Sequence, residues 1–215
     1  TVFPAHAGAP TDYIGTNFNN TSGAGTISNW MLTPEIALAN GDTISFWTST
    51  TVGSIWPDRL ELRLSTAGAS TNVGTLATDV GDFTTLLLTV NPTLAAGGYP
   101  ETWTQFTATL SGIPAATTGR IGFRYFVTDG GPTGSNSDSI VIDTVEFTAA
   151  PAGLTLTKTV GTVLGVCAVT DAITVVYGTE VYYCFQVENT SATTFNLHDL
   201  VDDHLGALLG NFPYV

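Results

Sequence analysis

Apolar and polar residues alternate along much of the first 148 residues. Residues 59–65 read RLELRLS, with leucine at every second position, and residues 120–127 read RIGFRYFV, with a similar alternation. A period of two is typical of a strand that buries one face. Seven such segments, separated by turns rich in Gly, Asn and Pro, predict an all-β sandwich or jelly roll. The expected strands are 26–32, 43–50, 59–65, 84–90, 103–110, 120–128 and 139–147.

The composition changes at residues 149–153, which read AAPAG and are typical of a short linker. Further strands are expected at 154–160, 172–177 and 180–188, with another apolar segment at 197–209. We therefore predict a jelly-roll domain at 1–149 and a smaller immunoglobulin-like β domain at 150–215. Because an immunoglobulin-like domain needs about 100 residues, the second domain is expected to be incomplete.

Charge is scarce and strongly negative. The net charge is −13, and only five residues are Lys or Arg. Four of those five lie in the segments 59–65 and 120–127, which predicts arginines held by carboxylates such as Glu61 in a cross-strand ladder. A chain this acidic is unsuited to nucleic acid or to anionic lipid surfaces. It also has no apolar run of the length that spans a membrane.

The two cysteines, Cys167 and Cys184, lie in the β-rich second segment. Neither has the spacing of a zinc site. The sequence leaves two alternatives, a disulfide or two buried free thiols. A disulfide would stabilise the segment by roughly 3 kcal/mol and would imply an oxidising compartment.

Several short motifs resemble a known family in their order along the chain. Residues 27–34 read ISNWMLTP, residues 41–47 read GDTISFW and residues 140–145 read IVIDTV. Together they resemble choice-of-anchor J domains, which are relatives of the cleaved-adhesin domains of bacterial surface proteins. The resemblance covers about residues 1–148, and residues from 154 onward resemble a conserved-repeat domain of such proteins. It implies a secreted, extracellular protein with a structural or adhesive role and no catalysis.

Two departures from the family bear on assembly. Choice-of-anchor J domains usually begin with an earlier strand than this chain does, and the second domain stops early. A sandwich without its first strand has an open edge, and open edges pair with other chains. A strand from a neighbouring subunit would fill that edge, which predicts a homopolymer in the manner of donor-strand fibres. The alternative is that the missing strands lie outside this stretch of sequence.

The resemblance also implies a structural calcium ion. Asp143 stands where the related domains carry the Asp of an ID-x-V motif, and relatives often hold calcium there to pin the first strand. Asp129 and Asp138 flank a Gly-rich loop with oxygen ligands, although the spacing is not that of an EF-hand. We expect calcium at Asp143 from the resemblance, and at Asp129 and Asp138 from the composition of the loop, for which the alternative is a plain inter-strand loop. The alternative for Asp143 is a pair with Arg120, Arg124 or a turn amide.

Aromatic residues offer a second kind of site. Trp56 and Tyr99 precede prolines in predicted loops, and their rings are candidates to stack on a sugar, or else to anchor the loops. This favours a monomeric module that binds a glycan or a host-surface protein as the alternative to a polymer. The chain has no G-x-S-x-G motif and no phosphate-binding loop, so we predict that it is not an enzyme.

Overall fold

The computed structural model describes residues 3–114, 117–151, 153–189 and 197–213. The chain divides into two compact units, unit 1 at Thr1–Ala150 and unit 2 at Pro151–Val215, and each is described here by itself. Among the described residues, no helix is long and apolar enough to cross a lipid bilayer.

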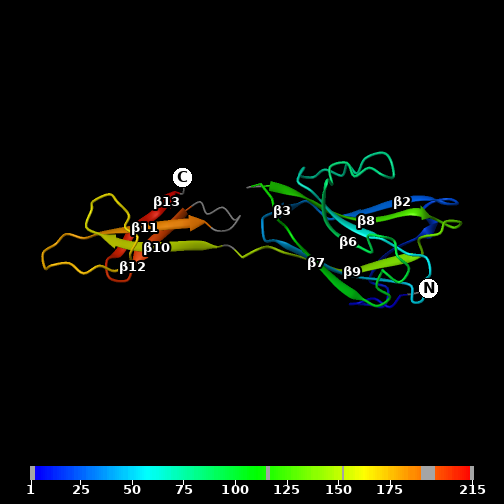
Figure 1. Ribbon diagram of the computed structural model, residues 1–215, viewed down its shortest axis with the longest axis horizontal. Helices are drawn as coiled ribbons and strands as arrows, with labels where there is room; N and C mark the ends of the chain where they lie inside the picture. The colour runs from blue at the N-terminus through cyan, green and yellow to red at the C-terminus, as the bar shows by residue number, and fades with distance from the viewer. Residues whose placement is uncertain (1–2, 115–116, 152, 190–196, 214–215) are drawn as a thin grey trace. The chain divides into compact units, whose positions relative to one another are not determined.

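Unit 1 is a sandwich of two antiparallel sheets (Figure 1). Sheet A has the order β1 (Ile14–Asn17), β9 (Ser139–Thr148), β4 (Thr43–Thr50) and β7 (Thr104–Thr109). Sheet B has the order β2 (Gly25–Leu32), β8 (Thr117–Gly130), β5 (Leu60–Ser65) and β6 (Thr85–Val90), and β3 (Ile36–Leu38) also pairs with β8. Leaving out β3, this interleaved order over eight strands is that of a jelly roll. The predicted all-β class is confirmed.

The core lies between the two sheets and follows from the alternation in the sequence. Phe46 from β4 meets Phe123 from β8 edge to face, with ring centroids 5.0 Å apart. Leu60, Leu62 and Leu64 of β5 are all buried in the same cluster. Their spacing of two puts the three leucines on one face of the strand, and burying each of them stabilises the fold by roughly 1.5–3 kcal/mol.

All seven strands expected in unit 1 are present, with ends shifted by a few residues. The sequence missed β1 and β3, which have only four and three residues and show no clear alternation. Because β1 takes the first position in the jelly roll, the expectation that the sandwich lacks a first strand is wrong. Instead, β1 is short and covers only Ser139–Ile142 of the ten-residue β9.

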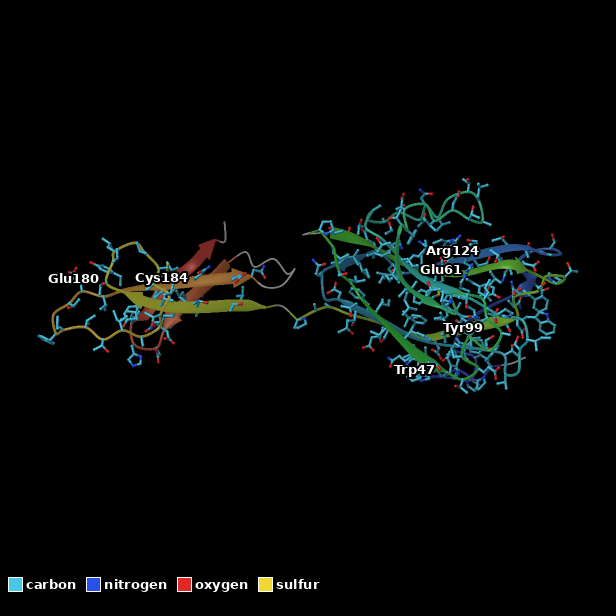
Figure 2. All side chains as sticks on the ribbon, viewed as in Figure 1. Trp47, Glu61, Tyr99, Arg124, Glu180 and Cys184 are labelled. Atoms are coloured by element: carbon cyan, nitrogen blue, oxygen red, sulfur yellow. A yellow bond between two sulfur atoms is a disulfide. The ribbon has the colours of Figure 1, made fainter. Side chains whose placement is uncertain are left out.

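The outer face of sheet B carries the arginines. The register places Glu61 opposite Arg124, and Glu61 forms ion pairs of 2.7 Å with Arg63 and 3.1 Å with Arg124 (Figure 2). The predicted ladder is therefore confirmed for these three residues. Arg59 and Arg120 instead donate to backbone carbonyls, so for them the expected carboxylate partner is wrong.

Three of the arginines, Arg63, Arg120 and Arg124, hold a long loop, residues 66–84, on sheet B. Arg124 donates to the carbonyl of Ala77 at 2.6 Å, Arg120 to that of Ala69 at 3.2 Å, and Arg63 to that of Phe83 at 3.4 Å. Arg124 is only 1% exposed although it lies on the outer face, because this loop covers it. Its guanidinium also lies 3.7 Å from the ring centroid of Phe126. The three arginines therefore fix a segment that has no strand of its own.

The described residues of unit 2 form two antiparallel strand pairs. One pairs β10 (Leu154–Gly161) with β11 (Tyr182–Asn189), and the other pairs β12 (Leu197–Asp202) with β13 (Gly206–Pro213). Cys167 and Cys184 form a disulfide with their Cα atoms 5.2 Å apart, which settles the choice between a disulfide and free thiols. The strand expected at 172–177 is wrong, because these residues pair with no strand and Val176 and Tyr177 are exposed.

Candidate docking groove

A groove opens where the edge strands of the two sheets face each other. One cavity of about 340 Å³ and a second of about 440 Å³ lie between β1 and β2. They share Ile14, Met31, Phe123 and Ile142 in their walls, so they form one continuous groove. We refer to it as the β1–β2 groove. It exists because β1 and β2 are the outer strands on the same side of the sandwich.

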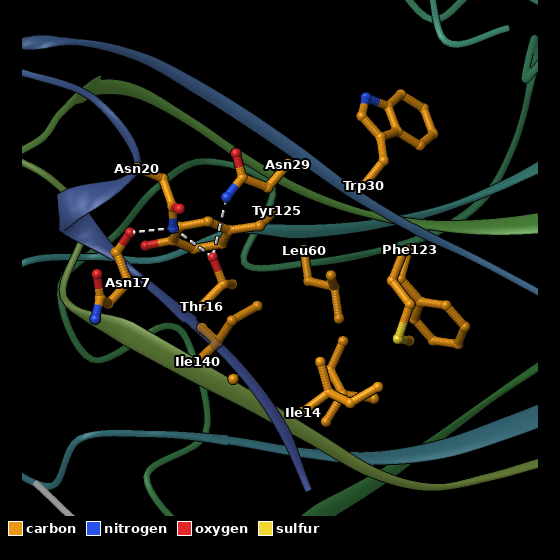
Figure 3. Close-up of a pocket in the computed structure, with 13 residues that line it drawn as sticks. Ile14, Thr16, Asn17, Asn20, Asn29, Trp30, Leu60, Phe123, Tyr125 and Ile140 are labelled. Carbon is orange, nitrogen blue, oxygen red and sulfur yellow. Dashed lines mark hydrogen bonds between the residues drawn. The ribbon is translucent and has the colours of Figure 1, made fainter. Parts of the chain in front are cut away.

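The two ends of the groove differ in chemistry, and Figure 3 shows the polar end. At one end, Thr16 Oγ1 accepts hydrogen bonds from the side-chain amides of Asn20 (2.6 Å) and Asn29 (3.3 Å). The other end runs past Met31 and Leu32 of β2 toward Val145 of β9 and is mainly apolar. An occupant of this second end would therefore gain chiefly by burying apolar side chains.

The apolar end of the groove coincides with an unpaired strand edge. β4 covers one edge of β9 over most of its length, from Ile140 to Thr148. On the other edge, β1 pairs only as far as Ile142. Within the described residues, Asp143–Thr148 therefore has no strand on its outer side. The β9 backbone at this edge can form a ladder with an added strand.

The N-terminal segment is bound to side chains of sheet A and adds no strand to the β9 edge beyond β1. The amides of His6 and Ala7 donate to Asp143 Oδ2 at 2.8 and 3.1 Å. The His6 ring stacks on Trp47 with a centroid distance of 3.9 Å, and Trp103 Nε1 donates to the carbonyl of Pro4 at 3.0 Å. These contacts hold residues 4–7 on the outer face of sheet A, where His6 Nδ1 also lies 3.0 Å from Thr144 Oγ1 of β9. The sequence alone did not indicate this path.

Asp143 accepts hydrogen bonds from backbone amides and is not paired with Arg120 or Arg124. A turn amide was one of the partners proposed for it as an alternative to calcium. Partial burial raises the pKa of Asp143, but the hydrogen bonds from Ala7, Thr144 and His6 outweigh it, so the pKa lies below its ordinary value. The carboxylate stays ionised at neutral pH and holds the N-terminal segment. Thr144, the next residue, has a φ of +49°, and the register with β4 shifts here by one residue. Such a bulge re-aims the strand and its side chains.

A buried polar network joins both sheets beside the groove. Asp58 accepts hydrogen bonds from Tyr125 Oη (2.6 Å), from Thr50 Oγ1 (2.7 Å) and from the amide of Asp138 (2.9 Å). Burial raises the pKa of Asp58, the hydrogen bonds oppose this rise, and the net shift is upward from 3.8. Thr50 also contacts the carbonyl of Ser139 at 2.8 Å, and one hydroxyl proton cannot serve both acceptors at once. When Asp58 is protonated it can donate to Thr50, and the Thr50 hydroxyl can then donate to the carbonyl of Ser139.

We expect Asp58→Asn to remove a pH dependence of stability. Because the folded pKa lies above the unfolded one, the wild-type protein loses stability as pH rises from about 3.8 through the folded pKa. Asparagine cannot ionise and can donate to Thr50. Urea unfolding of both proteins across this pH range would measure the difference. Asp58→Ala is the control, and it should cost about 1–3 kcal/mol for each polar group left without a partner. Equal slopes for wild type and Asp58→Asn would contradict the assignment.

The two aromatic residues predicted to bind a ligand differ in their exposure to solvent. Trp56 is 48% exposed and presents its ring to solvent. Tyr99 is 3% exposed, and its hydroxyl lies 2.6 Å from Thr48 Oγ1. The two residues line one small cavity together with Glu101, but only Trp56 offers a surface for stacking.

The aspartates predicted to bind calcium do not gather. Asp129 Oδ2 accepts from the amide of Ser135, and Asp138 Oδ1 accepts from the hydroxyl of Ser139. Across the described ranges, the one group of three side chains close enough together to hold a metal ion is Asp202, Asp203 and His204. Calcium therefore stays a prediction, from the resemblance for Asp143 and from the composition of the loop for Asp129 and Asp138. The groups that donate to Asp143 are the amides of His6, Ala7 and Thr144 and the Thr144 hydroxyl.

Comparisons with known proteins find similarity only among solved structures. No family model matches the chain, and neither does any curated protein. The K3 and K1 cleaved adhesin domains of Lys-gingipain from Porphyromonas gingivalis are 23% and 24% identical, each with a TM-score of 0.43. They match over 64% and 65% of this chain and 74% and 75% of their own. The K2 domain is 18% identical, with a TM-score of 0.41, over 68% of this chain and 75% of its own. At this level of similarity, the roles of those domains do not transfer to the chain.

Proposed function

We propose that this chain is an extracellular structural or adhesive subunit that self-associates by adding a strand of one copy to the β1–β2 groove of another. The observation that carries the proposal is the coincidence of the unpaired β9 edge with the apolar end of the groove. Strand addition needs both features, since main-chain hydrogen bonds give affinity and pockets for alternate side chains give specificity.

A second copy is the occupant that we favour, because each chain also carries strands that can be donated. In the described part of unit 2, β10 and β11 pair only with each other. Leu154 and Leu156 of β10 alternate with threonines and are about half exposed. An acceptor in unit 1 and a donor in unit 2 form a head-to-tail contact, and such contacts build open filaments unless the rotation closes a ring.

An extracellular setting and a role without catalysis are parts of the same proposal. The disulfide of unit 2 fits an oxidising compartment, because thiols in the cytosol are kept reduced. The residues that resemble choice-of-anchor J domains agree with a bacterial surface protein. The strongly acidic composition would keep such a protein soluble outside the cell and leaves nucleic acid an unfavourable partner.

Light scattering coupled to size-exclusion chromatography over a range of protein concentrations tests the proposal. Strand addition predicts species larger than one chain whose proportion rises with concentration. A single monomeric mass at every concentration, in the presence and absence of calcium, would contradict it.

A monomeric binding module is the second candidate, and the exposed ring of Trp56 is the observation that favours it. We expect Trp56→Ala to abolish glycan binding in an array or pull-down with polysaccharides if this candidate is correct. Tyr99→Phe is the matched control, because it keeps the ring and removes only a buried hydroxyl. Equal glycan binding by Trp56→Ala and the wild type would exclude Trp56 as the stacking platform.

A further inference from the structure

Unit 2 contains a close contact between a lysine and an aspartate, Lys158 and Asp202. Lys158 Nζ on β10 lies 2.5 Å from Asp202 Oδ2 at the end of β12. The Asp202 side chain is 4% exposed, whereas that of Lys158 is 42% exposed. The pair joins the two hairpins, between which the described residues form no strand pairing. A bond between these side chains would tie the hairpins together.

The other oxygen of Asp202 is held by two backbone donors. The amides of His204 and Leu205 lie 3.0 and 2.9 Å from Oδ1. Two amides aimed at one oxygen are the arrangement that stabilises an oxyanion in acyl transfer. The carboxyl group is thus polarised by amides at Oδ1 and contacted by an amine at Oδ2.

Aromatic rings restrict the surroundings of the amine. Lys158 Nζ lies 4.8 Å from the ring centroid of Tyr183 and 5.4 Å from that of Phe185. Both rings belong to β11, the strand that pairs with β10. They limit the positions that the amine can take and keep it beside the carboxyl group, which is the effect of proximity on a reaction between two groups.

From this geometry we propose that Lys158 and Asp202 form an intramolecular amide, an isopeptide bond, with release of one water molecule. A proton first passes from Lys158 Nζ to Asp202 Oδ2 along their hydrogen bond. The free electron pair of Nζ then attacks Cγ, and the carbonyl electrons move to Oδ1 between the two amides. A second proton passes from Nζ to Oδ2, the Cγ–Oδ2 bond breaks, and water leaves. No other reactant is needed.

The starting ion pair makes the reaction slow. The hydrogen bond with Asp202 raises the pKa of Lys158. The hydrogen bond from Lys158, together with the amides of His204 and Leu205, lowers the pKa of Asp202 to about 2. The first proton transfer is therefore uphill. We expect the bond to form once per chain after folding, and to accumulate during incubation of the folded protein.

Intact-mass spectrometry and trypsin digestion of the whole chain test the proposal. Lys158 is the last Lys or Arg in the sequence, and Arg124 is the one before it. The unlinked, reduced chain gives the tryptic fragments 125–158 and 159–215. The linked chain is lighter by one water molecule. Because trypsin does not cleave after a lysine whose side chain is acylated, the linked chain gives one fragment, 125–215, after reduction of the disulfide. Fragmentation should place the link between Lys158 and Asp202.

Lys158→Arg is the matched control, because it keeps a cation beside Asp202 but removes the reactive primary amine. It should show the full mass and two separate fragments. The proposal is overturned if the wild-type chain keeps its full mass after prolonged incubation, or if Lys158→Arg loses the same water molecule.

Discussion

Arg124→Ala is expected to lower the free energy of unfolding of unit 1 by about 3 kcal/mol, because it breaks a buried ion pair from one side. The substitution removes hydrogen bonds to Glu61, Ser28 and the carbonyl of Ala77. It also removes the contact with the Phe126 ring. Arg63 remains beside Glu61, so we expect the lower part of the range for such losses. Chemical denaturation followed by tryptophan fluorescence would measure the change.

Arg120→Ala is the control for this prediction. It also removes a hydrogen bond to the loop at residues 66–84. Unlike Arg124, Arg120 is not paired with Glu61, so this substitution leaves the ion pairs of Glu61 intact. We expect a loss of about 1 kcal/mol, the usual contribution of a hydrogen bond. Limited proteolysis should then cut the 66–84 loop faster in Arg124→Ala than in Arg120→Ala. Equal stabilities of the two variants would show that the buried arginine does not hold the loop.

Val145→Lys is expected to abolish self-association while unit 1 stays folded. Val145 lies on the unpaired stretch of β9 and lines the apolar end of the groove. Its side chain is already 43% exposed, so a lysine there can extend into solvent. A charge at this place opposes the addition of a strand, which is how natural proteins protect open edges. Light scattering should report monomers at concentrations where the wild type associates.

Val52→Lys is the matched control, since Val52 is 75% exposed in a turn and lines neither cavity of the groove. It makes the same change in charge and should associate like the wild type. If both variants associate normally, the groove is not the site of contact. If both become monomeric, net charge and not the groove governs association.

The sequence was sufficient for the parts of the fold that depend on local alternation. Leucine at every second position of residues 60–64 predicted both the strand and its buried face, and the opposite face correctly predicted the pairing of Glu61 with Arg63 and Arg124. Burial of one face is encoded residue by residue, so it can be inferred without knowledge of the partner strand.

Features that depend on contacts between distant residues were missed. The four residues of β1 have no strong pattern, and their place in the sheet is set by pairing with β9 more than 120 residues later. The stretch 172–177 is apolar enough for a strand but has no partner edge in the structure. Tyr99 looked like a loop aromatic, yet its hydroxyl finds Thr48 in the core.

The candidate groove was predictable only in part. An open edge followed from the resemblance to choice-of-anchor J domains, but its cause differs from the expected missing strand. The N-terminal segment is held by Asp143 and by the stacking of His6 on Trp47, and β1 begins only at Ile14, opposite Ile142 of β9. Every residue except proline has a backbone amide, so the residue types do not show which amides bind Asp143. The course of the N-terminal segment could therefore not be inferred from the sequence.

Negative-stain electron microscopy of the native material, with and without a chelator, tests the central claim most directly. Strand addition between copies predicts regular filaments or layers in the wild type and dispersed particles for Val145→Lys. Loss of the filaments on chelation would place calcium at the contact. Dispersed monomers of the wild-type protein under all conditions would contradict the account, and the chain would then be a module that binds its partner as a single copy.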